Sequence, residues 1–164
     1  MTPLLCLSPK KATATFTEVF HMPRLAYPLI RYRFDDGSQE EHALHPYIPI
    51  RISNQSSGNS AKVYALVDTG ADECLFGADI AEQLGHDLKG DGVKSSVNIG
   101  IEQREISVYK HTFKLELLSP DEKTVVWVSD NIEIDCSESN PPILLGARDF
   151  LRYFKWVSTI QAKS

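Results

Sequence analysis

The chain has 164 residues, a length at which one compact domain is expected rather than two. Lys and Arg total 17 against 22 Asp and Glu, giving a net charge of -5. This balance argues against a nucleic-acid binder and against docking on anionic lipid, because both need a basic surface. No apolar run approaches the roughly 18 residues of a membrane span. We therefore expect neither nucleic acid nor a membrane among the partners.

The cysteines and the N-terminus bear on the cellular compartment. Cys6, Cys74 and Cys136 are odd in number and far apart, which does not fit a disulfide framework. The N-terminal sequence MTPLLCLSPKK has a short apolar run with no basic residue before it, unlike a secretory signal peptide. We expect a protein of the reducing cytoplasm.

Residues 1–26 show no sustained hydrophobic period, so we interpret them as an N-terminal extension that precedes a domain over 27–164. From Tyr27 the sequence changes to apolar stretches of strand length, separated by turn-forming segments. These stretches are 27–34, 47–53, 63–68, 105–118, 124–129 and 131–134.

Two details refine these strands. The polar segment 53–60 is typical of a hairpin loop. Between Val108 and Phe113 the apolar positions switch from even to odd, which predicts a bulge or bend near 109–111.

Helical period is confined to two short segments. Residues 78–84 place Ile80, Ala81 and Leu84 on one face, with Gly85 as a C-terminal cap. The segment 147–154 shows the same spacing. Helices this short must pack on a sheet. The fold class is therefore mostly β, with one or two short helices, and a closed or nearly closed β-barrel fits because it removes exposed edges.

The most informative stretch is VYALVDTGADECLFGADIAEQLG, residues 63–85. An apolar strand ends at Val67, and the triplet Asp68-Thr69-Gly70 follows directly. Ionisation of a carboxyl group at such a place is costly, and the neighbouring Thr hydroxyl and Gly backbone N–H can hold a carboxylate.

The second informative stretch is PPILLGARDFLRYF, residues 141–154. Two prolines precede an apolar stub, Ile143–Leu145, and Gly146 allows close approach of another backbone. We predict a strand that passes under the Asp68 loop and braces it.

Together, ALVDTGADECLF and ILLGARDFL resemble the retropepsin-like aspartic proteases, the single-domain relatives of pepsin that act as homodimers. The likeness covers about residues 45–158. It implies a closed β-barrel acid-protease protomer, a flap hairpin over the cleft and an extended peptide or protein as substrate. It also implies catalysis by Asp68 with Thr69 and Gly70, substrate contacts at Ala71 and Asp72, and no metal or cofactor.

The chain contains one Asp-Thr-Gly and no second copy, so an intramolecular pair of catalytic carboxyl groups is excluded. Two carboxylates that share one proton can activate water and protonate the carbonyl oxygen, as aspartic proteases do. The resemblance therefore implies a homodimer in which each subunit supplies one Asp68.

The sequence departs from the family at the flap. Residues 96–111 occupy its place, and Gly100 and Ile101 map to its substrate-contacting tip. Gly100 is the tip's single glycine, whereas the family's tip is usually rich in glycine. The alternative function is a non-catalytic dimeric module that keeps the fold and binds a peptide. A second departure is Ala147 after Gly146, which leaves open whether Arg148 reaches Asp72.

Other interpretations of these residues are weaker. Asp68-Thr69-Gly70 can be a simple turn after a strand, and Asp-x-Gly turns also occur in phosphotransferases. The chain lacks a phosphate-binding loop of the Walker type and an alternating strand–helix pattern. His42 and His45 lack a helical setting and a third ligand, so we do not expect a metal site there.

Overall fold

The computed structural model describes residues 4–9, 24–31, 44–99 and 105–159, and the chain is mostly β. Its elements in chain order are β1 (Leu4–Pro9), β2 (Leu25–Pro28), β3 (Ile30–Arg31), β4 (Leu44–His45), β5 (Tyr47–Ser53), β6 (Ser60–Val67), β7 (Leu75–Gly77), α1 (Ala78–Gln83), β8 (Lys94–Ile99), β9 (Glu105–Leu118), β10 (Val125–Ser137), β11 (Leu144–Leu145), the 3₁₀ helix η2 (Leu151–Tyr153) and β12 (Phe154–Thr159). Among these elements there is no helix of the length and hydropathy needed to cross a membrane.

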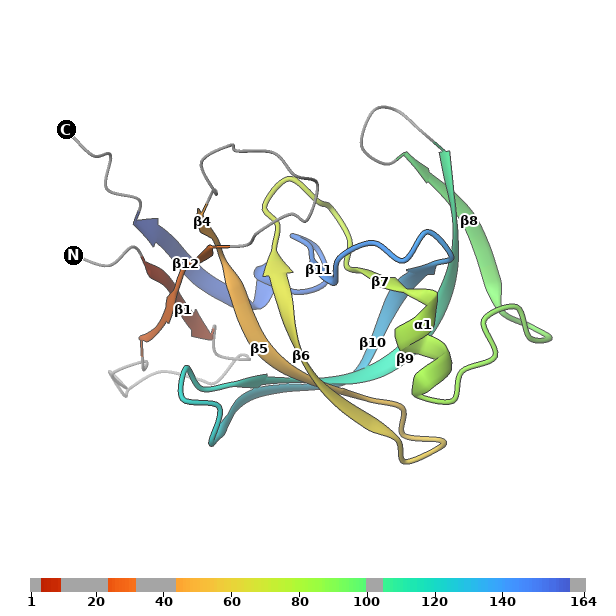
Figure 1. Ribbon diagram of the computed structural model, residues 1–164, viewed down its shortest axis with the longest axis horizontal. Helices are drawn as coiled ribbons and strands as arrows, with labels where there is room; N and C mark the ends of the chain where they lie inside the picture. Colours follow the sequence, from red (N-terminus) through yellow and green to blue (C-terminus); the bar gives the residue numbers. More distant parts are fainter. Residues whose placement is uncertain (1–3, 10–23, 32–43, 100–104, 160–164) are drawn as a thin grey trace, which may run out of the picture.

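The largest sheet wraps around on itself (Figure 1). Its order is β10-β7-β11-β6-β5-β9-β8, and β10 also pairs with β9, so the strands from β10 to β9 form a ring. The buried apolar side chains of this ring include Ile48, Ile50, Phe113 and Leu115. In β9 they alternate with more exposed residues over 112–117, as expected for a strand with one face on a core, whereas in β5 the residue between Ile48 and Ile50, Pro49, is buried as well.

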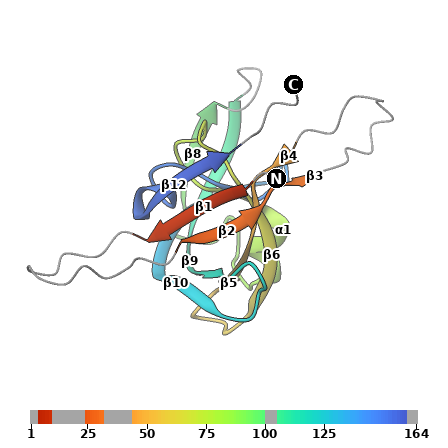
Figure 2. The ribbon, with the colours of Figure 1, turned by 90° about the vertical axis from the view of Figure 1, so that its left-hand side faces the viewer.

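A second sheet, β12-β1-β2, lies at one end of the ring (Figure 2). Leu5 and Leu7 of β1 are buried in the main core, although both fall in the segment interpreted from sequence as an extension. The hydrophobic period was missed because β1 offers only two inward positions. The first strand of the fold therefore begins at Leu4 in the described part of the chain.

The predicted strands 47–53 and 105–118 match β5 and β9, and the polar segment 53–60 connects β5 and β6 as an antiparallel hairpin. The predicted strands 124–129 and 131–134 form one strand, β10. The pairing of β10 with β9 shifts register between Val125 and Trp127 and between Ser129 and Ile132. The second shift lets the strand continue past the polar residue that separates the two predicted strands.

The predicted bulge near 109–111 is wrong. Pairing of β9 with β10 runs through these residues without a shift, and pairing with β8 covers 105–110 without one. The parity of apolar positions changes because both faces of the sheet are covered here: successive residues of β10, Asp135 and Cys136, are both buried.

The helix prediction for 78–84 is confirmed by α1, and Gly85 follows it with a φ of +86°. The segment 147–154 forms a turn and η2 instead of an α-helix. Phe154 already belongs to β12, where it lies opposite Pro9 of β1, so pairing with β1 ends the helical turn early.

Tyr27 connects the second sheet to the ring. Its ring is 1% exposed, and its hydroxyl donates a hydrogen bond of 2.6 Å to the carbonyl oxygen of Leu118 at the end of β9. Burial raises the pKa of the Tyr27 phenol, so the hydroxyl stays protonated and remains a donor. The sheet β12-β1-β2 is thus part of the same folded unit.

We predict that Tyr27→Phe lowers the free energy of unfolding by about 1–2 kcal/mol, because it leaves the buried Leu118 carbonyl without its partner. Urea denaturation measures the loss. Tyr64→Phe is the matched control: Tyr64 is 49% exposed and its hydroxyl contacts the Glu122 side chain, so its removal should change stability by less than about 0.5 kcal/mol. Equal losses in the two variants would contradict this assignment.

Candidate active site

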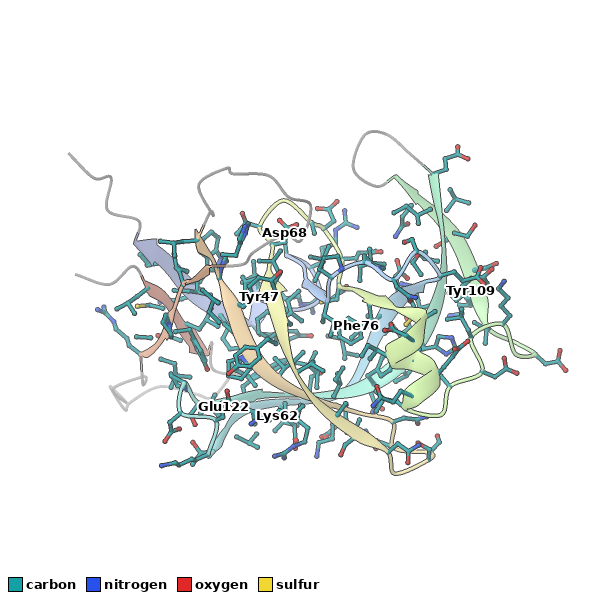
Figure 3. All side chains as sticks on the ribbon, in the orientation of Figure 1. Tyr47, Lys62, Asp68, Phe76, Tyr109 and Glu122 are labelled. Atoms are coloured by element: carbon teal, nitrogen blue, oxygen red, sulfur yellow. The ribbon has the colours of Figure 1, made fainter. Side chains whose placement is uncertain are left out.

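Asp68 lies directly after β6, at the end of that strand opposite to Lys62 (Figure 3). The preceding residue, Val67, is buried, and its N–H donates to the carbonyl of Pro46 at 3.0 Å. The backbone N–H of Asp68 donates to the carbonyl of Leu145 at 3.1 Å. The backbone of Asp68 is therefore fixed by the strands on either side of β6.

The Asp68 carboxylate accepts a hydrogen bond of 2.8 Å from the backbone N–H of Gly70. This contact closes the Asp-Thr-Gly turn and fixes the orientation of the carboxylate, as predicted for the glycine N–H. Asp68 is half-buried, whereas Thr69 and Gly70 are exposed. The turn consequently presents its polar groups on the surface of the single chain.

The predicted brace is β11. Leu144 and Leu145 pair in parallel with Leu66 and Val67 of β6, so β11 runs beside the strand that carries Asp68. Gly146 then packs directly on the segment after the turn: a Cβ atom at Gly146 would lie 2.3 Å from the carbonyl oxygen of Glu73. Only glycine fits this crossing, because the neighbouring atoms are backbone atoms that cannot move aside independently.

The turn after β11 holds the residues after Asp-Thr-Gly. The N–H groups of Ala147 and Arg148 donate to the carbonyls of Ala71 and Asp72 at 2.8 and 2.7 Å. The Arg148 guanidinium also reaches the Asp72 carboxylate at 3.4 Å, which answers the question raised by the inserted Ala147. Both side chains are more than half exposed, so this ion pair adds little stability and the backbone bonds fix the segment.

Cys74, which is buried, also bonds to the turn after β11. Its N–H donates to the Asp149 carboxylate at 2.9 Å, and its sulfur accepts the N–H of Gly146 at 3.3 Å. Burial raises the pKa of the Cys74 thiol to about 12, so the sulfur is a neutral packing atom rather than a reactive thiolate.

A group of polar side chains that sequence reasoning missed surrounds Asp135. Asp135 of β10 is 2% exposed, and its carboxylate contacts Lys110 at 3.1 Å and the Asn98 amide at 2.8 Å. The Glu73 carboxyl also hydrogen-bonds Asp135, and this contact, followed by burial, raises the pKa of Glu73. The sequence signal was slight, because alternation with Ile134 and Cys136 indicated that Asp135 faces solvent.

Residues 94–99 and 105–110 form an antiparallel hairpin from β8 and the first part of β9. This hairpin includes most of the segment 96–111 that was predicted to form the flap, and in Figure 1 it rises on the upper side of the molecule, where Figure 3 shows Asp68. Gly100 and Ile101, the predicted substrate contacts at its tip, lie outside the described residues, as does His42.

A polar cavity of about 360 Å³ lies elsewhere, between the β5–β6 loop, the loop after α1, β9 and β10, and Asp68 does not line it. Its lining includes His86 and His111, whose ring centroids are 4.8 Å apart. His111 Nε2 contacts the Leu88 carbonyl, and the buried Nε2 of His86 has no hydrogen-bond partner among the described residues. Among the residues that the structure describes, no group of three or more His, Cys, Asp or Glu side chains is placed to hold a metal ion.

No protein-family model matches this chain, and no curated protein matches it.

We predict that Gly146→Ala lowers the free energy of unfolding by at least about 2–3 kcal/mol, because the added methyl overlaps the Glu73 backbone. Urea denaturation measures this. Gly90→Ala is the control: its Cβ would meet only side-chain atoms of Asp87, at 3.0–3.1 Å and none of them backbone, so a loss below about 1 kcal/mol is expected. A tolerated Gly146→Ala would refute the close crossing.

Burial, followed by the nearby His111, lowers the pKa of His86 from its ordinary 6.5. Below that pH the unfolded chain takes up a proton that the folded protein resists, so this group makes stability fall as pH decreases from about 7.5 to 5.5. His86→Gln should weaken this fall, measured by urea denaturation at both pH values. The test compares the pH dependence of stability in His86→Gln with that in the unmodified protein. Both proteins keep Glu73, whose raised pKa makes stability rise as pH decreases. An unchanged pH dependence would contradict the role of His86.

Proposed function

We propose that the chain is one protomer of a homodimeric aspartic endopeptidase, with Asp68 as the catalytic residue of each subunit. The observation that carries the proposal is the Asp-Thr-Gly turn itself. Its carboxylate is oriented by the Gly70 N–H, and its backbone is braced by β11 in front of Gly146. Such a rigid support is what a general acid–base residue requires.

The proposed chemistry needs two carboxyl groups that share one proton. At about 4 Å and an effective dielectric constant near 20, two ionised carboxylates repel by about 4 kcal/mol, which favours retention of a proton between them. The ionised carboxylate takes a proton from water while the protonated partner donates to the carbonyl oxygen of the peptide. The pKa values then belong to the pair of Asp68 residues and not to either one.

A second copy of the chain suits the surface around Asp68. Thr69 and Gly70 are exposed in the single chain and would be covered by the partner's turn. In the described part of the chain β12 is an edge strand, with Trp156 41% and Val157 63% exposed. It is the uppermost strand of its sheet in Figure 2, and Asp68 lies on the upper side in Figure 3. An unpaired, partly apolar edge strand favours strand pairing with a partner.

The ring of strands supports the finer assignment as a closed acid-protease barrel. A substrate in extended conformation would bind along Ala71 and Asp72 and under the β8–β9 hairpin, adding its backbone to strand edges. The alternative, a non-catalytic peptide-binding dimer, draws support from the glycine-poor tip at 100–104. A binding module has no need of a paired carboxylate, which favours the enzyme.

We predict that Asp68→Asn reduces peptide hydrolysis by about 10³-fold or more and leaves the dimer intact, because the amide cannot act as a general base. Digestion of a peptide library at several pH values, with products identified by mass spectrometry, measures hydrolysis. Sedimentation velocity measures the dimer.

Asp121→Asn is the control for the loss of one carboxylate, since Asp121 lies in the β9–β10 turn next to Glu122, which is on the lower side in Figure 3 whereas Asp68 is on the upper side. It should keep full activity. A dimer that binds peptides without cleaving any would select the non-catalytic alternative, and a monomer at all concentrations would refute both functions.

A further inference from the structure

The outer part of the β8–β9 hairpin receives little support from the rest of the sheet. Pairing of β9 with β10 begins at Val108 and pairing with β5 at Lys114, so in the described part of the chain residues 105–107 pair with β8 alone. β8 is the last strand in the order of this sheet and forms the margin of the molecule in Figure 1. An isolated two-stranded hairpin is only marginally stable in water. The position of this hairpin therefore depends on contacts made by its side chains.

Among the described residues, two polar side-chain contacts join β8 to β10, the strand on the other side of β9. The Asn98 amide donates a hydrogen bond of 2.8 Å to Oδ2 of Asp135. Lys94 contacts the Glu133 carboxylate at 3.9 Å, and both of these side chains are at least 60% exposed. An exposed ion pair of this kind contributes little to stability. The hydrogen bond between Asn98 and Asp135 is therefore the contact that can hold the hairpin.

The acceptor of this hydrogen bond is a carboxylate that is shielded from water. Asp135 is 2% exposed, and Nζ of Lys110 lies 3.1 Å from its Oδ1. A buried carboxylate oxygen needs a donor, because it has lost its hydrogen bonds to water. Asn98 supplies a donor to Oδ2 from another strand, so movement of the hairpin away from β10 removes that donor. The hydrogen bond thus opposes the movement.

We propose that Asn98 is a positioning residue, whose hydrogen bond to Asp135 holds the β8–β9 hairpin against β10 and so fixes the element under which the substrate binds. The inference deepens the proposed peptidase function and rests on it for the effect on substrate affinity. Asn98 acts through the hairpin and not on the reacting atoms. Its loss should therefore weaken the binding of substrate and of transition state alike, which raises KM and leaves kcat unchanged.

Asn98→Ala tests the proposal by two measurements on the full chain. Amide hydrogen exchange of residues 94–99, corrected for intrinsic rates, should become about tenfold faster or more, because a hydrogen bond to a charged group is lost where the hairpin opens. For a peptide that the unmodified protein cleaves, KM should rise about tenfold while kcat stays within about twofold. A role in general stability alone would not divide the effect between KM and kcat in this way.

A reciprocal exchange of the two side chains isolates this hydrogen bond from other effects of the substitutions. Asn98→Asp sets two carboxylates against each other, so it should accelerate exchange and raise KM at least as much as Asn98→Ala. Adding Asp135→Asn to it restores one donor and one acceptor. The double variant should therefore return both quantities to within about threefold of their values in the unmodified protein.

Lys94→Ala is the matched control, because it truncates another side chain of β8 and removes the exposed contact to β10. It should change KM and the exchange of residues 95–99 by less than about twofold. Equal effects of Lys94→Ala and Asn98→Ala, or a folded double variant that does not recover, would overturn the proposal. If none of these proteins cleaves a peptide, the peptidase function fails, whereas the exchange measurements still decide whether Asn98 holds the hairpin.

Discussion

The close crossing of Gly146 over the Glu73 backbone is the constraint on which the site depends. It lets β11 run in parallel beside β6 and lets the following turn bond to Ala71 and Asp72. A larger residue would push β11 away from β6 and release the carbonyl of Leu145 from the Asp68 N–H. The orientation of the Asp68 carboxylate thus depends on a residue far along the chain that makes no contact with it.

Different parts of this site are held with different strength. Backbone hydrogen bonds and buried apolar packing fix Asp68, whereas the Asp72–Arg148 ion pair is exposed and screened. The Asp135 carboxylate lies between these cases, because it is buried and is contacted by the charged Lys110 and by Asn98. Ionic conditions should therefore affect the Asp72–Arg148 contact more than the Asp68 turn.

Much of the strand pattern was predictable, and the failures have a common cause. Strands β5 and β9 are continuous apolar-rich stretches between turn-forming segments, so their bounds could be taken from the sequence. The strand β1 was missed and the bulge near 109–111 was wrongly predicted where burial comes from a second layer. Alternation of apolar and polar residues reveals a strand with one face buried. It gives no signal for Asp135, because Asp135 is a polar residue that is buried by its contacts with Asn98 and Lys110.

The sequence by itself determined that the chain is mostly β, that Asp68-Thr69-Gly70 follows a buried strand and that a glycine after an apolar stub braces it. These are local properties, set by alternation, turn chemistry and the size of single residues. Only the tertiary structure decided that β1 joins the fold, that 147–154 turns into β12 instead of a helix, and that Glu73, Asp135, Lys110 and Asn98 meet. Those outcomes depend on pairings between distant segments, whose free energy no local pattern encodes.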